Sequence, residues 1–287
     1  MNVRTLLGTV AALALAAVMA LPTQAQAKDW KKVVIATEGA FAPYNLTRPD
    51  GKLDGYEIEL GNYLCKHMKV TCEFVTVDWN SVIPGLQAGK YDAIMDGMSI
   101  TAKRLEIIDF SLPYADSPST FAVMKDSPLV NMPYTGKRIS LDDKAATEAM
   151  VKAVAPALKG KTIGVQVSTI QAAALDAFFK GVATVRTYGK TEEHDLDLQD
   201  GRLDIEIASS NYFVSVLGKP GGDKIVLTGP LMTGGPLGSG SAVGLRKSDP
   251  ELKAMFNDAM HAARADGTLK TLAEKWFHND VVPTSWN

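Results

Sequence analysis

The chain has 287 residues, with 30 lysines and arginines against 32 aspartates and glutamates, for a formal net charge of −2. So balanced a composition lacks the clustered basic face of a nucleic-acid-binding protein, and we expect no nucleic-acid partner. This length is enough for one large domain or two modest ones.

The first 27 residues have the features of a secretory signal peptide. A basic start at Arg4 precedes an apolar run over 6–21, and Ala25-Gln26-Ala27 forms a small-residue cleavage site. We predict cleavage after Ala27. The alternative is an uncleaved membrane anchor, which needs about 20 apolar residues and leaves the alanine ending unexplained. Nothing later in the sequence resembles a membrane-spanning helix.

The only two cysteines are Cys65 and Cys72. In an exported chain, such a pair favours a disulfide. The alternative is half of a metal site, but only His67 of the four histidines lies near in sequence. We therefore predict a disulfide, and neither a metal nor a cofactor.

Strand-like and helix-like segments alternate through the first half of the chain. The expected strands cover 32–37, 72–77 and 91–95, and the expected helices cover 58–68 and 80–90. Thr101 is a suitable N-cap for a further helix over 101–108. Strand–helix alternation predicts an α/β fold with parallel strands.

The second half repeats this pattern. Strands are expected over 161–166, 183–188, 203–208 and 242–247, and helices over 168–179, 191–201, 249–267 and 268–277. The glycine- and proline-rich stretch 230–241 is expected to be a loop. The polar segment 128–158 is expected to be a surface insertion, with one helix-like patch at 146–159. No complete phosphate-binding loop or Gly-x-Ser-x-Gly nucleophile elbow is present.

The stretch DGMSITAKR, residues 96–104, places hydroxyls and an arginine around the start of a predicted helix. Arginine offers a planar fork that matches a carboxylate, and helix starts favour anions. These nine residues alone favour a simpler interpretation, a capped helix with Arg104 paired to a surface acid. Both interpretations stay open at this point.

Several segments together resemble the periplasmic solute-binding proteins for polar amino acids. The resemblance is greatest to the lysine/arginine/ornithine, histidine and opine receptors of ABC importers. The segments that carry it are ATEGAFAPYN, GYEIELGNYLCKHM, YDAIMDGMSITAKR, GVQVST, GRLDIEIA, VGLRK and ADGTLKTLAEKWF. They span nearly the whole chain after the signal peptide.

The resemblance implies an α/β fold of two lobes joined by two strands, with a ligand held in the cleft between them. Lobe 1 would comprise 28–117 and 240–287, lobe 2 would comprise 118–232, and 233–239 would connect them. It also implies a monomeric periplasmic receptor that passes its ligand to an ABC permease in the cytoplasmic membrane.

The resemblance assigns the ligand's α-carboxylate to the stretch 96–104. From this stretch the implied ligand-binding residues are Asp96, Gly97, Met98, Ser99 and Arg104. Asp96 would add either negative charge or only its backbone carbonyl. From lobe 2, three residues at a strand-to-helix junction would close over the same carboxylate: Ser168, Thr169 and Ile170.

At the other end of the ligand, Glu38 matches the acidic residue that related receptors place near a positive side chain. Phe41 and Trp79 match positions that stack on the ligand's carbon chain, and Tyr44 is a further candidate. From the residues alone, core packing is the favoured interpretation of Phe41 and Trp79.

One position departs from the basic amino-acid receptors. They carry an aspartate on lobe 2 for the α-ammonium, whereas this chain has Ser209 there. In an opine that nitrogen is a secondary amine bearing a second carboxylate, which an aspartate would repel. We therefore expect an opine-like ligand, with arginine, ornithine, lysine or histidine as alternatives.

Two other functional classes remain open to test. A dehydratase that acts on cyclic carboxylates shares this fold, and Glu38 could act as an acid there, but the sequence shows no paired acid and base. A soluble protein of this kind could instead present its ligand to a separate sensor.

Overall fold

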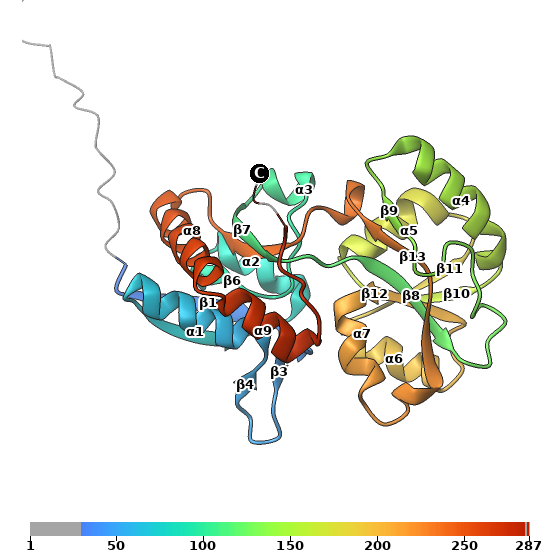
Figure 1. The fold of residues 1–287 in the computed structure, drawn as a ribbon, viewed down its shortest axis with the longest axis horizontal. Coiled ribbons are helices and arrows are strands. Elements are labelled where there is room, and N and C mark those ends of the chain that lie inside the picture. Colours follow the sequence, from blue (N-terminus) through green and yellow to red (C-terminus); the bar gives the residue numbers. More distant parts are fainter. Residues whose placement is uncertain (1–29, 285, 287) are drawn as a thin grey trace, which may run out of the picture.

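The computed structural model describes residues 30–284 and residue 286. The predicted signal peptide and its cleavage site lie outside these residues. The described chain forms two α/β lobes that lie side by side (Figure 1). Among these residues, no helix has both the length and the apolar character needed to cross a bilayer.

The first lobe is built on a five-stranded sheet with the order β5-β1-β6-β14-β7. Its strands are β1 (Lys32–Thr37), β5 (Thr71–Thr76), β6 (Ala93–Ile94), β7 (Asp109–Ala115) and β14 (Ser241–Leu245). Its helices are α1 (Tyr56–Met68), the short 3-10 turn η1 (Trp79–Ser81), α2 (Val82–Gln87), α3 (Ala102–Leu105), α8 (Pro250–Ala265) and α9 (Thr268–Phe277). A small sheet of β2 (Ala40–Phe41), β3 (Asn45–Thr47) and β4 (Leu53–Asp54) extends from this lobe.

The second lobe is built on a six-stranded sheet with the order β11-β10-β12-β8-β13-β9. Its strands are β8 (Ser119–Met124), β9 (Arg138–Ser140), β10 (Thr162–Gln166), β11 (Thr184–Tyr188), β12 (Ile205–Ser209) and β13 (Ile225–Thr233). Its helices are α4 (Lys144–Leu158), α5 (Ile170–Phe179), α6 (Thr191–Gln199) and α7 (Ser210–Leu217), with the 3-10 turns η2 (Gly222–Lys224) and η3 (Gly235–Leu237).

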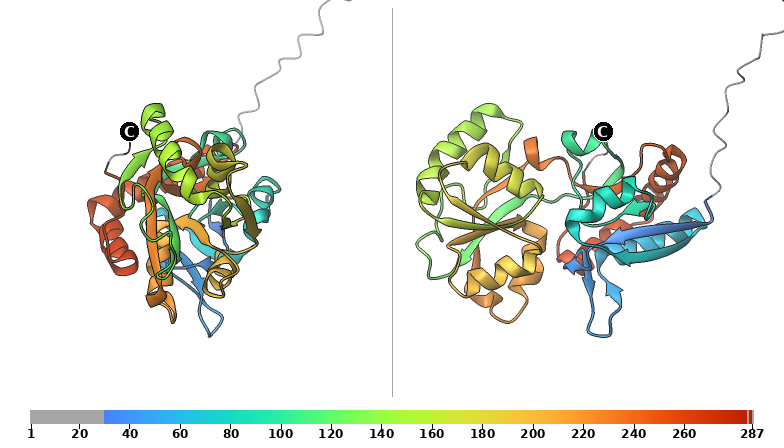
Figure 2. Two further views of the ribbon diagram at one scale, coloured as in Figure 1. Left: turned by 90° about the vertical axis from the view of Figure 1, so that its right-hand side faces the viewer. Right: turned by 180° about the vertical axis from the view of Figure 1, so that it is seen from behind.

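The chain passes between the lobes twice, as both ribbon views show (Figures 1 and 2). Residues 116–118 join β7 to β8, and residues 234–240 join β13 to β14. Strands β8 and β14 therefore enter their sheets from the other lobe rather than through a helical crossover. Both pair antiparallel with their neighbours, so the prediction of parallel strands was wrong for β14, and β8 was not predicted as a strand.

Three sequence predictions need correction. The predicted loop 230–241 begins as strand, because β13 continues to Thr233 and pairs with β9. The predicted surface insertion 128–158 contributes to the core, since α4 buries Met150, Val154 and Leu158 against the second sheet. These residues recur every four positions and form one apolar face. The helix predicted over 101–108 stops at Leu105, although Thr101 does cap it.

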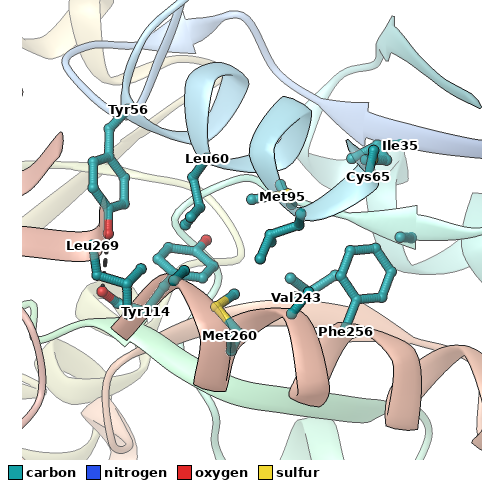
Figure 3. Close-up of a cluster of buried hydrophobic side chains, with 14 of the residues drawn as sticks. Ile35, Tyr56, Leu60, Cys65, Met95, Tyr114, Val243, Phe256, Met260 and Leu269 are labelled. Atoms are coloured by element: carbon teal, nitrogen blue, oxygen red, sulfur yellow. Dashed lines mark hydrogen bonds between the residues drawn. The ribbon is translucent and has the colours of Figure 1, made fainter. Parts of the chain in front are cut away.

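The core of the first lobe lies between the sheet and helices α1, α8 and α9 (Figure 3). Tyr56 from α1 is fully buried, and its hydroxyl donates to the carbonyl oxygen of Tyr114 in β7 at 3.0 Å. Leu60, Phe256 and Met260 pack in the same cluster. This packing fixes α1, which carries the buried Glu57 toward the region between the lobes.

Cys65, at the end of α1, and Cys72, in β5, form the predicted disulfide. Replacing both with serine should lower the free energy of unfolding by about 2–3 kcal/mol, since the link restricts the unfolded chain over a short loop. Chemical denaturation of the two proteins under non-reducing conditions checks this value. Equal midpoints would show that the disulfide adds no stability.

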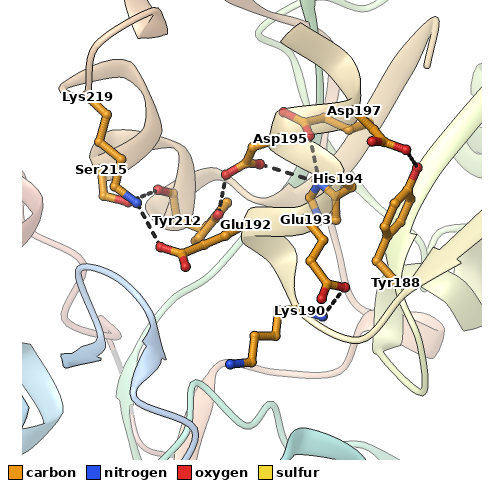
Figure 4. Close-up of polar contacts among 11 residues, drawn as sticks. Tyr188, Lys190, Glu192, Glu193, His194, Asp195, Asp197, Tyr212, Ser215 and Lys219 are labelled. Carbon is orange, nitrogen blue, oxygen red and sulfur yellow. Dashed lines mark hydrogen bonds and ion pairs between the residues drawn. The ribbon is translucent and has the colours of Figure 1, made fainter. Parts of the chain in front are cut away.

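The second lobe buries a polar cluster beneath α6 (Figure 4). His194 Nδ1 lies 2.6 Å from Glu206 Oε2 and 3.4 Å from Asp195 Oδ1, and Tyr212 donates its hydroxyl proton to Asp195. The atoms of His194, Asp195 and Glu206 that could bind a metal ion lie within 4.8 Å of one another. Two ligands of one metal ion stand about 3 Å apart or more. The 2.6 Å separation therefore favours a shared proton rather than an ion.

This cluster should make stability depend on pH. Burial raises the pKa of Glu206 to about 8 and lowers the pKa of His194 to about 4. Between the ordinary pKa of histidine and pH 8, the folded pair keeps a proton that the unfolded chain has lost. Stability therefore falls as pH rises through this window, by about 1–2 kcal/mol for this pair. Denaturation at pH 6.5 and pH 8 should show a smaller fall for Glu206→Gln, and parallel curves would contradict the shared proton.

Candidate functional site

A cavity between the two lobes is lined by residues from the ends of strands in both sheets. The lining atoms surround about 540 Å³ of space, part of it open to solvent. Ligands of α/β proteins commonly bind beyond the carboxyl ends of strands. Ten of the predicted site residues line this cavity: Glu38, Phe41, Trp79, Asp96, Gly97, Ser99, Arg104, Thr169, Ile170 and Ser209.

Three predicted site residues lie elsewhere. Tyr44 is buried in the first core behind Phe41, and its hydroxyl accepts a hydrogen bond from Asn211 Nδ2 of the other lobe at 2.9 Å. Met98 is fully buried among the apolar side chains that α2 packs against the sheet. Ser168 has a φ of 60° and precedes Thr169, the N-cap of α5, without lining the cavity.

Arg104 supplies positive charge to the cavity. Its Nη1 donates to the carbonyl oxygen of Ser99 at 2.9 Å, and its guanidinium lies 5.3 Å from the centre of the Trp79 ring. Burial lowers its pKa to about 10. Within residues 30–284 this guanidinium forms no ion pair with a carboxylate. A buried cation without an anion is costly unless a ligand supplies one.

Glu38 supplies negative charge and comes directly after β1. Gln166, the last residue of β10, reaches across from the second lobe and donates Nε2 to Glu38 Oε1 at 3.1 Å. The same amide donates to the carbonyl oxygen of Gly189 at 3.1 Å. Burial raises the pKa of Glu38 to about 7, against the opposing effects of Gln166 and then Lys190.

Asp96 lies against Glu38 and is held by backbone and side-chain donors. Its Oδ1 accepts from the Glu38 N–H at 2.8 Å and from Asn45 Nδ2 at 3.1 Å. Asn45 Nδ2 also donates to Glu57 Oε2 at 2.7 Å, and Glu57 Oε1 accepts from the Gly97 N–H at 2.7 Å. This network fixes the backbone at Glu38 and at Gly97. The other oxygen of Asp96 is buried and has no hydrogen-bond partner among the described residues.

Phe41 forms the aromatic wall of the cavity. It stacks between Tyr44 and Tyr212, with ring centres 5.3 and 5.1 Å away. Gly97 packs against its other edge: a Cβ there would lie 2.7 Å from Phe41, and the glycine has a φ of 58°. Phe41 thus bridges the two lobes, because Tyr212 belongs to α7 of the second one.

Ser209 ends β12 and meets a second hydroxyl from the connection between the lobes. Its Oγ lies 2.5 Å from Ser117 Oγ and also accepts from the Asn211 N–H at 3.1 Å, which caps α7. Both serines line the cavity. This corner therefore presents two hydroxyl groups to the cavity.

Some lining residues were absent from the sequence prediction, among them Gln166, Gln171, Thr191 and Ser117. One indication of Gln166 was present in the sequence, since it is a polar residue at the end of an apolar strand. Gln171 donates to Ser119 Oγ at 3.0 Å and Thr191 begins α6, so their positions depend on tertiary contacts.

Residues 33–279 match the family described as bacterial extracellular solute-binding proteins, family 3. The chain is 42% identical to the octopine-binding periplasmic protein of Rhizobium meliloti, over 93% of this chain and 97% of that protein. It is 37% identical to the L-arginine-binding protein of Pseudomonas aeruginosa, over 96% and 97%.

Solved structures agree with the fold. A periplasmic His/Glu/Gln/Arg/opine family-binding protein from Silicibacter pomeroyi, in complex with lysine, matches with a TM-score of 0.68 and 33% identity. The match covers 88% of this chain and 99% of that one. An ancestral arginine-binding protein bound to arginine matches with a TM-score of 0.73 and 25% identity, over 86% and 98%. The chain therefore belongs to family 3 of the bacterial extracellular solute-binding proteins.

Proposed function

We propose that this protein is the periplasmic receptor of an ABC importer and captures a basic amino acid or an arginine-derived opine. One observation carries the proposal. The same cavity is lined by a partly buried arginine, Arg104, which forms no ion pair with a carboxylate within residues 30–284, and by two buried carboxyl groups, Glu38 and Asp96. A ligand with a carboxylate at one end and a guanidinium or ammonium at the other complements both.

The pair of serines, Ser117 and Ser209, favours an opine within this class. An opine places a second carboxylate beside its secondary amine, and two hydroxyl groups can donate to it. An aspartate there would repel it. The octopine-binding relative is consistent with this choice, and the arginine-binding relative keeps free arginine as the alternative.

Capture by closure is supported by contacts that already cross between the lobes. Gln166 reaches Glu38, Asn211 reaches Tyr44, and Ser215 Oγ donates to the carbonyl oxygen of Ala42 at 2.9 Å. A ligand favours the closed form only by as much as it binds that form better. In this proposal the lobes are 28–117 with 240–287 and 118–232, and they move about the two connections. The protein acts as a monomer that docks on a membrane permease and performs no catalysis.

Titration calorimetry tests the proposal with ligand-stripped protein lacking residues 1–27. The panel is arginine, ornithine, lysine, histidine, octopine and nopaline. Tight binding of an opine with weak binding of the amino acids supports the full proposal. Tight binding of a free basic amino acid supports the receptor and refutes the opine assignment. Heat from none of them would refute the assignment of Glu38 and Arg104 as ligand-binding residues.

A further inference from the structure

Three buried carboxyl groups lie close together at the cavity. Glu38 and Asp96 line it, and Glu57 is linked to Asp96 through Asn45. Glu38, Asp96 and Glu57 are 9%, 3% and 0% exposed. Asp96 Oδ1 contacts the Glu38 backbone at 2.8 Å, and Asn45 links Asp96 to Glu57 through one amide nitrogen. Within residues 30–284, none of the three forms an ion pair. Such a group of buried like charges is unfavourable unless protons or a cation neutralise it.

The unpartnered oxygen of Asp96 shows where a cation would be received. Asp96 Oδ2 is buried and has no hydrogen-bond partner in the part of the chain that the structure describes, and Asp96 lines the cavity together with Glu38. Gln166 already donates to both oxygens of Glu38, at 3.1 and 3.3 Å. A guanidinium that enters beside this amide would face both carboxyl groups.

The charged and polar groups around the pair come from several elements. Those that act on Glu38 are Gln166, Lys190, Asp78 and Glu192, and those that act on Asp96 are Glu38, Glu57, Asn45 and Arg104. Glu57 in turn accepts from Tyr114, Asn45 and Gly97. Lys190 and Arg104 are the cations in this set, and neither pairs with the carboxyl groups.

We propose that the Glu38–Asp96 pair holds a proton while the cavity is empty and that the cationic end of the ligand displaces it. This inference rests on the proposed function and adds to it a dependence of binding on pH. The two carboxyl groups titrate as a coupled pair, because ionising one raises the cost of ionising the other. A bound guanidinium removes that cost, so the pair is fully ionised only in the complex.

Ligand affinity should fall as the pH is lowered, because the ligand must displace a proton from the carboxyl pair. Burial raises the pKa of Glu38 to about 7, and burial followed by the charges of Glu38 and Glu57 raises the pKa of Asp96 well above its ordinary value. Protons therefore compete with the ligand below neutral pH. With the pKa of Glu38 at about 7, competition by its proton alone should make affinity at pH 6 about tenfold weaker than at pH 8.

Calorimetry at pH 6.5 in phosphate and in imidazole measures the released proton, because these buffers differ in ionisation enthalpy. We expect arginine or octopine, whichever binds, to release about three quarters of a proton per ligand. Asp96→Asn keeps an acceptor for the Glu38 N–H and should release less than half as much. Asp176→Asn, which removes an exposed carboxylate on α5, is the matched control and should release as much as the unchanged protein.

Citrulline separates the two ends of the ligand, since it resembles arginine but has an uncharged distal group. It should release no proton, even if it binds weakly. Binding heat of arginine or octopine that is the same in both buffers would overturn the inference and leave the receptor proposal intact. Equal release with arginine and citrulline would also overturn it. Absence of any binding would instead refute the proposed function.

Discussion

Replacing Arg104 with methionine is expected to weaken binding of every carboxylate ligand by about 100-fold or more. A carboxylate held by two charge-assisted hydrogen bonds gains about 1.5–3 kcal/mol from each. The guanidinium is largely buried and forms no ion pair in the described chain, so the loss should appear in binding and not in folding. Removing an unpaired buried charge should leave the melting temperature equal or higher.

Calorimetry and thermal melts on the same samples measure both effects. Lys103→Met is the matched control, because Lys103 is the exposed neighbour on α3 and should bind as before. Arg104→Lys should fall between the two, since an ammonium keeps the charge but loses the planar fork. Binding by Arg104→Met within fivefold of the unchanged protein would show that the carboxylate binds elsewhere.

Replacing Ser209 with aspartate is expected to reverse the preference between opines and free amino acids. The new carboxylate would pair with the α-ammonium of arginine and repel the second carboxylate of octopine. We expect the ratio of octopine affinity to arginine affinity to fall by about 100-fold, which corresponds to about 2.7 kcal/mol. Aspartate is also a favoured N-cap, so the contact of Ser209 with the Asn211 N–H at the start of α7 should persist.

Ser209→Asn is the control for this switch, because asparagine has the shape of aspartate without its charge. Competition titrations of the three proteins with octopine and arginine give the affinity ratios. If Ser209→Asn changes the affinity ratio as much as Ser209→Asp, the volume of the side chain at position 209, rather than its charge, determines the preference between the two ligands. An unchanged ratio in Ser209→Asp would mean that the ligand does not place its amine beside Ser117 and Ser209.

The fold could be anticipated where local signals were strong. Local sequence predicts both α8, from its Asp249-Pro250 start, and α1, from the spacing of its apolar residues. The structure has both helices. The misread segments depend on distant partners. Thr233 lies in a strand because β9 pairs with it, and α4 is a core helix because the second sheet lies beneath it.

In the candidate site too, residues in local motifs could be predicted, whereas residues positioned by distant partners could not. The resemblance pointed to residues within recognisable motifs, such as Glu38 and Arg104. It did not single out Gln166, although this residue lies in the quoted segment GVQVST; its partners Glu38 and Gly189 are 128 and 23 residues away in sequence. Asp96 was expected to offer either charge or only a carbonyl. Its side chain lines the cavity and also accepts the Glu38 N–H, a contact that no sequence spacing predicts.

A crystal structure of the protein with bound octopine would show which groups of the cavity hold each end of the ligand. We expect the guanidinium within about 2.7–3.2 Å of Glu38, one carboxylate at a similar distance from Arg104, and the second carboxylate facing Ser117 and Ser209. A ligand bound in the reverse direction, or outside the cavity between the lobes, would contradict this arrangement.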